Sequence, residues 1–157
     1  MRDINKIIVH CSATYPDQDV GVDTIRRWHV EERGWDDIGY HYVIRRDGTV
    51  EEGRPIIKAG AHCRGQNKNS VGVCLEGGLE RVGSPNDTLY TTEPSNDYTP
   101  VQLKSLGKLI LTLRTKYGTK DKIVELYGHN EFDSHKTCPN FDVIIWFTMD
   151  VIKDFVR

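Results

Sequence analysis

The sequence predicts a single α/β domain over residues 1–157, in which a central mixed β-sheet is flanked by about three helices. A length of 157 residues is common for one domain and sufficient to bury a core without disulfides. Short apolar and β-branched runs alternate with segments of helical periodicity, and neither a repeat nor a linker separates them. Such an order of elements favours a sheet with helices packed on it.

The expected strands are short and rich in apolar or β-branched residues. Residues 6–10 and 70–75 are predicted as buried strands, and residues 123–127 form another. Residues 40–44 combine aromatic and β-branched side chains. The Asp-Gly pair at 47–48 follows them, and this pair is the strongest short signal for a hairpin turn.

Three segments are predicted as helices. Residues 22–32 carry apolar side chains at three-to-four spacing, and Gly34 ends the pattern. The clearest helix begins at the capping sequence Thr-Pro-Val-Gln of residues 99–102 and is stopped by Gly118. A last helix is expected over residues 141–155.

Residues 79–99 differ from the rest of the chain. They contain two clusters of Pro, Ser, Asn and Asp and few apolar side chains. This composition predicts a long surface loop within the domain.

Charge and cysteine usage narrow the class of protein. The 21 basic and 23 acidic residues give a net charge of -2. This balance lacks the basic excess that is typical of proteins that bind nucleic acid or a membrane surface. The N-terminal apolar run is too short for a signal peptide, and no segment approaches the roughly 18 apolar residues of a membrane span. We therefore expect a soluble monomer made in the cytoplasm. Its four cysteines are expected to be reduced; they are Cys11, Cys63, Cys74 and Cys138.

Two histidines at predicted strand ends and one cysteine in a loop are candidate metal ligands. His10 closes the first apolar run, His129 directly follows the strand predicted at 123–127, and Cys138 lies in the loop beyond it. Imidazole and thiolate groups are preferred zinc ligands, and three protein ligands leave one position open for water, as in hydrolytic sites. His135 is a competing ligand because it is nearer to Cys138. We favour His129, because a strand end holds it more rigidly.

Each of these residues also has an ordinary structural interpretation. A single histidine is commonly a polar or core residue, and a single cysteine commonly packs as a small hydrophobic side chain. Because successive strand side chains point to opposite faces, Cys11 is expected to face the core if His10 faces the site.

Five stretches together carry a specific resemblance. In chain order they are Val-His-Cys-Ser-Ala-Thr (9–14), Gly-Tyr-His-Tyr (39–42), Arg-Asp-Gly-Thr-Val-Glu (46–51), Asn-Ser-Val-Gly-Val-Cys-Leu (69–75) and Lys-Thr-Cys-Pro (136–139). The chain resembles the type 2 N-acetylmuramoyl-L-alanine amidases, and among them most closely the small lysozymes of T-odd coliphages. The resemblance covers nearly the whole chain.

The resemblance implies the mixed-sheet fold shared with peptidoglycan recognition proteins. It also implies one zinc ion held by His10, His129 and Cys138, and catalytic roles for Tyr40 and Lys136. The bond cut would be the amide that joins N-acetylmuramic acid to the L-alanine of the stem peptide. Physically, a lysine beside the metal would stabilise the oxyanion, and the tyrosine would hydrogen-bond water or the oxyanion.

Three further residues are expected to line the substrate site. His62 falls in a segment that resembles the substrate-groove loop of the family, and Asn69 lies in another matching stretch. Glu131 is a candidate proton shuttle or a partner of His129.

The implied biological role is that of a phage endolysin, acting on bacterial peptidoglycan in the periplasm after the membrane is permeabilised. A non-catalytic peptidoglycan-binding module and a cell-wall recycling amidase are the alternatives. The coliphage lysozymes also inhibit their phage RNA polymerase, which makes this polymerase a candidate partner. The shorter segment before His10 and the longer loop at 79–99 argue against carrying that role over. The loop before Cys138 also differs, with one histidine in place of two and one additional residue.

Overall fold

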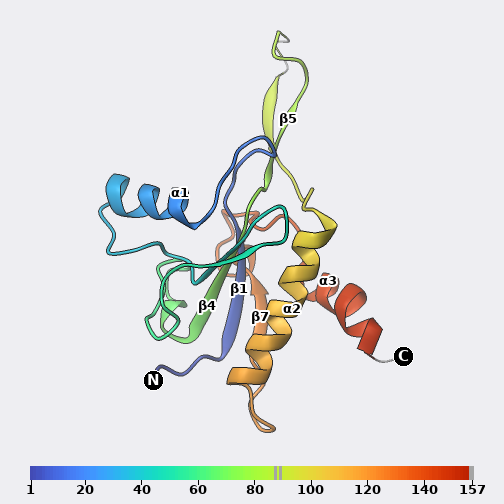
Figure 1. The fold of residues 1–157 in the computed structure, drawn as a ribbon. Coiled ribbons are helices and arrows are strands. Elements are labelled where there is room, and N and C mark those ends of the chain that lie inside the picture. Colours follow the sequence, from blue (N-terminus) through green and yellow to red (C-terminus); the bar gives the residue numbers. More distant parts are fainter. Residues whose placement is uncertain (87, 89, 156–157) are drawn as a thin grey trace.

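The computed structural model describes residues 1–86, 88 and 90–155, and its centre is a five-stranded sheet in the order β3-β2-β4-β1-β7 (Figure 1). The strands are β1 (Lys6–Cys11), β2 (Tyr42–Ile44), β3 (Val50–Glu52), β4 (Ser70–Leu75) and β7 (Glu125–Gly128). Strand β1 pairs in parallel with β4 and β7, β2 pairs in parallel with β4, and β2 with β3 is antiparallel. The predicted mixed sheet is therefore confirmed.

Helices cover both faces of the sheet. Helix α1 (Val22–Arg27) continues into a π-helical turn, Trp28–Glu32, and packs on one face. Helix α2 (Pro100–Tyr117) and α3 (Val143–Trp146) pack on the other. The expected capping box is present in α2: the Thr99 side chain accepts from the Gln102 amide, and the Gln102 side chain accepts from the Thr99 amide.

The alternation of side chains along the strands divides the core in two. Ile7, Val9 and Cys11 belong to the cluster beneath α2 and α3, as do the odd-numbered residues of β4. Cys74, the register partner of His10, belongs to the cluster beneath α1. His10 therefore lies on the α1 face, and Cys11 faces the core as expected.

A buried carboxylate ties the end of β4 to its surroundings. Glu76 is 3% exposed, and its oxygens accept hydrogen bonds from the Val20 and Arg46 amides and from the Arg45 guanidinium. The Gln102 side chain donates to the carbonyl oxygen of the same glutamate. The contacts join the segment before α1, the hairpin after β2 and the start of α2.

The segment predicted as a loop at 79–99 is partly a β-ribbon. Strands β5 (Leu79–Val82) and β6 (Thr91–Pro94) pair antiparallel and project from the domain (Figure 1). Most of their side chains are exposed, so no apolar pattern marks them in the sequence. Arg81 stacks on the ring of Tyr15 and pairs with Asp17, which braces the ribbon from outside.

Other boundaries move by a few residues. Strand β2 begins at Tyr42 rather than at residue 40, and β7 is displaced toward Gly128. The expected terminal helix is short: α3 passes into a π-helical turn, Phe147–Val151, and a 3₁₀ turn, Ile152–Phe155. Two more 3₁₀ turns lie at Asn67–Asn69 and His129–Glu131.

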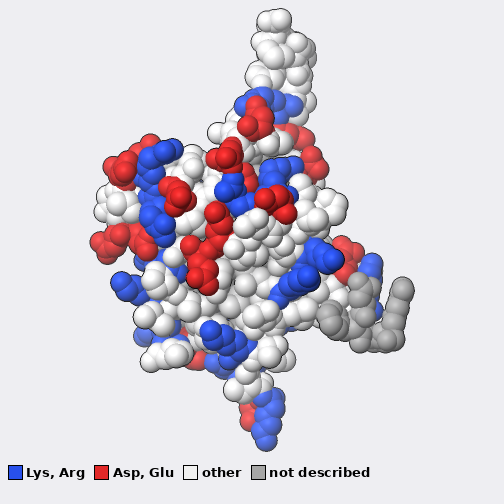
Figure 2. Space-filling view, viewed as in Figure 1, with Lys and Arg blue, Asp and Glu red and all other residues white. Residues whose placement is uncertain are grey.

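The surface agrees with the composition. Figure 2 shows acidic and basic side chains interspersed on the visible face, most densely over α1. In the described part of the chain no helix has the length and apolar character required to cross a membrane.

The replacement Glu76→Ala is expected to lower the free energy of unfolding by about 3 kcal/mol, because it leaves the Arg45 Nε group and the Val20 and Arg46 amides without their acceptor. Urea denaturation at pH 7 measures the change. Glu32→Ala, at an exposed position, should change stability by less than about 0.5 kcal/mol. Equal effects of the two replacements would contradict the central role of Glu76.

Candidate metal centre and active site

The structure brings together the three residues predicted as metal ligands. One ligand atom from each of His10, His129 and Cys138 can be chosen so that all lie within 4.8 Å of one another. The rings of His10 and His129 have centroids 4.5 Å apart. Two imidazoles and a thiol are a donor set that suits zinc, and the spacing fits a single ion. His135, the competing candidate, is exposed and lies outside this group.

The strand register creates this proximity. Val9 is aligned with Gly128 in the parallel β1–β7 pair, so the next residues, His10 within β1 and His129 directly after β7, lie at the same level. The loop then returns, and the Asn130 amide donates to the Cys138 carbonyl at 2.9 Å. The Cys11 amide donates to the Cys138 sulfur at 3.0 Å, which orients the thiol.

Asn140 fixes the far end of the loop. Its side-chain nitrogen donates to the carbonyl oxygens of Gly78 and Ser95, at 2.9 and 2.8 Å. Its backbone has φ of 73°, a left-handed conformation that asparagine tolerates better than most residues. The loop is thereby attached to the base of the β5–β6 ribbon.

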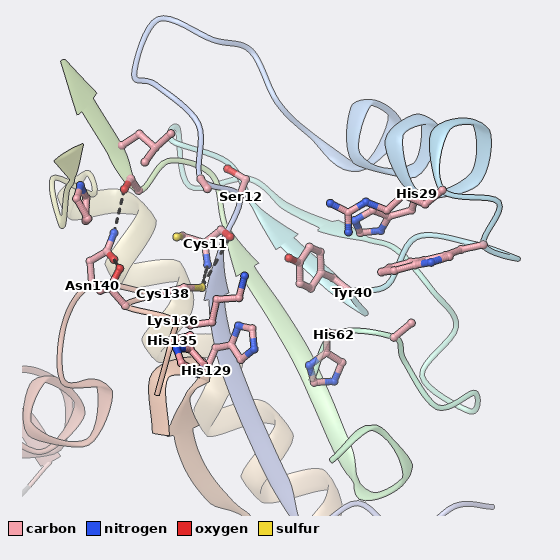
Figure 3. A pocket seen from close by; sticks show the side chains of 18 residues that line it. Cys11, Ser12, His29, Tyr40, His62, His129, His135, Lys136, Cys138 and Asn140 are labelled. Atoms are coloured by element: carbon pink, nitrogen blue, oxygen red, sulfur yellow. Dashed lines mark hydrogen bonds between the residues drawn. The ribbon is translucent and has the colours of Figure 1, made fainter. Parts of the chain in front are cut away.

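A cavity of about 430 Å³ opens above the cluster. Figure 3 shows Lys136, Cys138 and His129 on one side of this cavity and Tyr40, His62 and His29 on the other. The Tyr40 ring lies 5.2 Å from that of His10. Burial raises the pKa of Tyr40 well above its ordinary value, so its hydroxyl group remains a hydrogen-bond donor at neutral pH.

Lys136 is exposed and lies where three cavities meet. One neighbouring cavity includes Arg64 and Asn67, and the other includes Glu80 at the base of the ribbon. A substrate at the metal cluster can therefore extend in two directions past the same ammonium group.

The three residues predicted to line the substrate site differ in where the structure places them. Asn69 donates its side-chain amide to the Asp3 carbonyl at 2.7 Å and is outside the described cavities, whereas Asn67 lines one of them. Glu131 accepts from the Gly128 amide at 2.7 Å and stabilises the turn that carries His129. His62 lines the cavity, but its ring is buried against His10.

His29 and Trp35 also line the cavity, and the sequence interpretation did not select His29. The Nδ1 atom of His29 accepts from the Gly39 amide at 2.9 Å, and its ring lies 4.5 Å from Trp35. Burial, with Arg33 and Arg54 nearby, lowers the pKa of His29 to about 4. Its position one helical turn after Ile25, on the buried side of the helix, was the available signal.

His129 is suited to bind a metal at neutral pH. Burial is the largest effect and lowers its pKa below the ordinary value; Asp133 opposes this shift, and Lys136 adds to it. The ring is therefore neutral and has a free lone pair, as metal ligation requires.

Comparison with known proteins gives one family. The family model described as N-acetylmuramoyl-L-alanine amidase matches residues 1–141. The endolysin of Escherichia phage T7 is 45% identical over 141 residues, which cover 90% of this chain and 83% of the relative. The endolysin of Klebsiella phage KP32 is 42% identical, with coverages of 93% and 87%.

Solved structures agree with the fold. The N-acetylmuramoyl-L-alanine amidase LysC from Clostridium intestinale superposes with a TM-score of 0.73 at 27% identity, covering 99% of this chain and 87% of the other. Peptidoglycan recognition protein LE, solved in complex with tracheal cytotoxin, gives a TM-score of 0.71 at 20% identity, with coverages of 98% and 86%. The latter likeness concerns the fold alone.

Stability of the chelator-treated protein is expected to fall as the pH drops from about 6.5 toward 4. Burial lowers the pKa of His41 to about 4. The unfolded chain therefore takes up a proton at this histidine before the folded protein does. The contribution of His41 to stability is complete above about pH 6.5 and is lost as the pH falls from about 6.5 to about 4.

The variant His41→Gln should reduce the slope of unfolding free energy against pH by up to about 1.4 kcal/mol per unit. Urea titrations between pH 7 and 4.5 measure the slope, whatever the variant's absolute stability. The exposed His135→Gln replacement is the matched control. If unfolding free energy changed with pH equally in the wild type and in His41→Gln, the lowered pKa of His41 would not be the cause of the slope.

Proposed function

The chain belongs to the N-acetylmuramoyl-L-alanine amidase family, and we propose that it uses a zinc ion held by His10, His129 and Cys138. It is an amidase of bacterial peptidoglycan, cleaving between N-acetylmuramic acid and the L-alanine of the stem peptide. The observation that supports zinc is the group of three ligand atoms within 4.8 Å beside a cavity that Tyr40 and Lys136 line.

The side chains around the cavity have different roles in hydrolysis. Zinc in such a site lowers the pKa of bound water and polarises the amide carbonyl. Tyr40, whose hydroxyl keeps its proton at neutral pH, donates a hydrogen bond to the oxygen on which negative charge develops. Lys136 brings a positive charge to the same cavity and opposes the negative charge of the oxyanion.

The setting proposed is phage lysis of the host cell. The similar endolysins come from phages of Escherichia and Klebsiella. In this role the protein accumulates in the host cytoplasm and reaches the periplasmic peptidoglycan when the membrane is permeabilised. Product analysis on purified peptidoglycan should detect stem peptides with free L-alanine amino termini. New reducing sugar ends instead would identify a glycosidase.

The replacement Cys138→Ala should remove both bound zinc and amidase activity, because two imidazoles alone hold the ion weakly. Zinc content by elemental analysis and release of stem peptides are the measurements. Cys74→Ala, in the core beneath α1, is the control and should retain zinc. Retention of both properties by Cys138→Ala would show that the ligand set is wrong.

Replacing the groups that stabilise the oxyanion should give a different pattern. Tyr40→Phe and Lys136→Ala are each expected to lower kcat about 10²–10³-fold with zinc content unchanged. Comparison of kcat with zinc content separates the two kinds of residue. Loss of zinc in either variant would assign that residue to the metal site instead.

A further inference from the structure

Three buried side chains form a chain of hydrogen bonds behind the metal cluster. His10 Nε2 lies 2.8 Å from His62 Nδ1, and His62 Nε2 lies 3.1 Å from Ser70 Oγ. The three residues are 1%, 9% and 0% exposed. Their two contacts use both ring nitrogens of His62, so this imidazole is engaged within the protein on either side.

The local sequence places the His62 ring with little freedom. Ser70 and Gly72 lie on the same face of β4, and a Cβ at Gly72 would come within 2.5 Å of the ring. The missing side chain therefore makes room for the imidazole on the strand. The Asn67 side-chain oxygen accepts from the His62 and Cys63 amides at 2.9 and 3.0 Å, which holds the loop in place.

The direction of one hydrogen bond decides whether His10 can bind a metal. A neutral imidazole has one N–H donor and one acceptor nitrogen. If His62 Nδ1 donates to His10 Nε2, the proton of His10 is on Nδ1, and neither nitrogen is free for a metal. If His10 Nε2 donates to His62 Nδ1, the Nδ1 atom of His10 has a free lone pair.

In the second arrangement, each hydrogen bond of the His10–His62–Ser70 series has a donor and an acceptor. His62 then has its proton on Nε2 and donates it to Ser70 Oγ, which can accept. The Nδ1 atom of this tautomer carries a lone pair and can accept from His10 Nε2. Metal-binding histidines commonly donate their other ring N–H to a protein group, which orients the ring and raises its basicity as a ligand.

We propose that His62, supported by Ser70, is a positioning residue that accepts the Nε2 proton of His10 and thereby presents His10 Nδ1 to the metal. This inference rests on the proposed zinc site. It gives His62 a role different from the substrate contact that the sequence suggested. It also explains why a histidine beside the cavity is buried toward the sheet.

Zinc affinity, measured by competition with a chromophoric chelator, tests the role. His62→Leu removes the acceptor and should weaken zinc binding about 10–100-fold. His62→Asn places an amide oxygen near the position of Nδ1 and should remain within about threefold of wild type. His29→Leu, a cavity histidine whose Nδ1 contacts only backbone, is the control and should bind zinc as wild type does.

Nitrogen-15 NMR of the zinc-loaded wild-type protein gives a readout that needs no variant. The imidazole signals of His10 should show a proton on Nε2 and the metal on Nδ1. Wild-type protein that binds no zinc would refute the proposed zinc site and this inference with it. Tight zinc binding by wild type with equal affinity in His62→Leu, or with His10 coordinated through Nε2, would overturn the positioning role alone.

Discussion

The parallel pairing of β1 with both of its neighbours is the constraint on which the rest of the structure depends. A central parallel strand is covered on both faces, so each of its side chains must suit one layer or the other. In β1 the residues that face α2 are apolar, and His10 emerges on the α1 face. The alignment of Val9 with Gly128 then brings His129 beside it. A register shift of one residue would exchange the faces and separate the ligands.

The cluster of His10, His129 and Cys138 also requires a loop that brings Cys138 back to the edge of the sheet. Two backbone amides position the cysteine. The Cys11 amide donates a hydrogen bond to the Cys138 sulfur, and the Asn130 amide donates one to the Cys138 carbonyl oxygen. Asn140 attaches the same loop to the ribbon base. The three proposed metal ligands are thus carried by β1, a turn and a loop that hydrogen bonds join to one another.

The sequence predicts the elements that have strong patterns and misses those that do not. The continuous buried run of β4 and the capping box of α2 are local patterns, and both are placed correctly. The β5–β6 ribbon has mostly exposed side chains and pairs through its backbone, so composition alone suggested a loop. His10 and His129 could be singled out because each was predicted at a strand end, whereas Cys138 lies in a loop and was joined to them through the family resemblance. The contact of His62 with His10 spans 52 residues, and no spacing rule predicts it.

Polymerase inhibition stays a prediction, because no described feature bears on it.

The space left by Gly72 has a consequence for how this protein can tolerate change. Gly72 lines none of the three described cavities around Lys136, so an inspection of the cavity walls alone would not single it out. Yet any side chain there would meet the His62 ring, and through that ring it would displace His10, the proposed metal ligand on the neighbouring strand. The positions on which the proposed metal site depends therefore extend beneath the cavity into the sheet. Redesign of β4 for stability would have to retain this glycine.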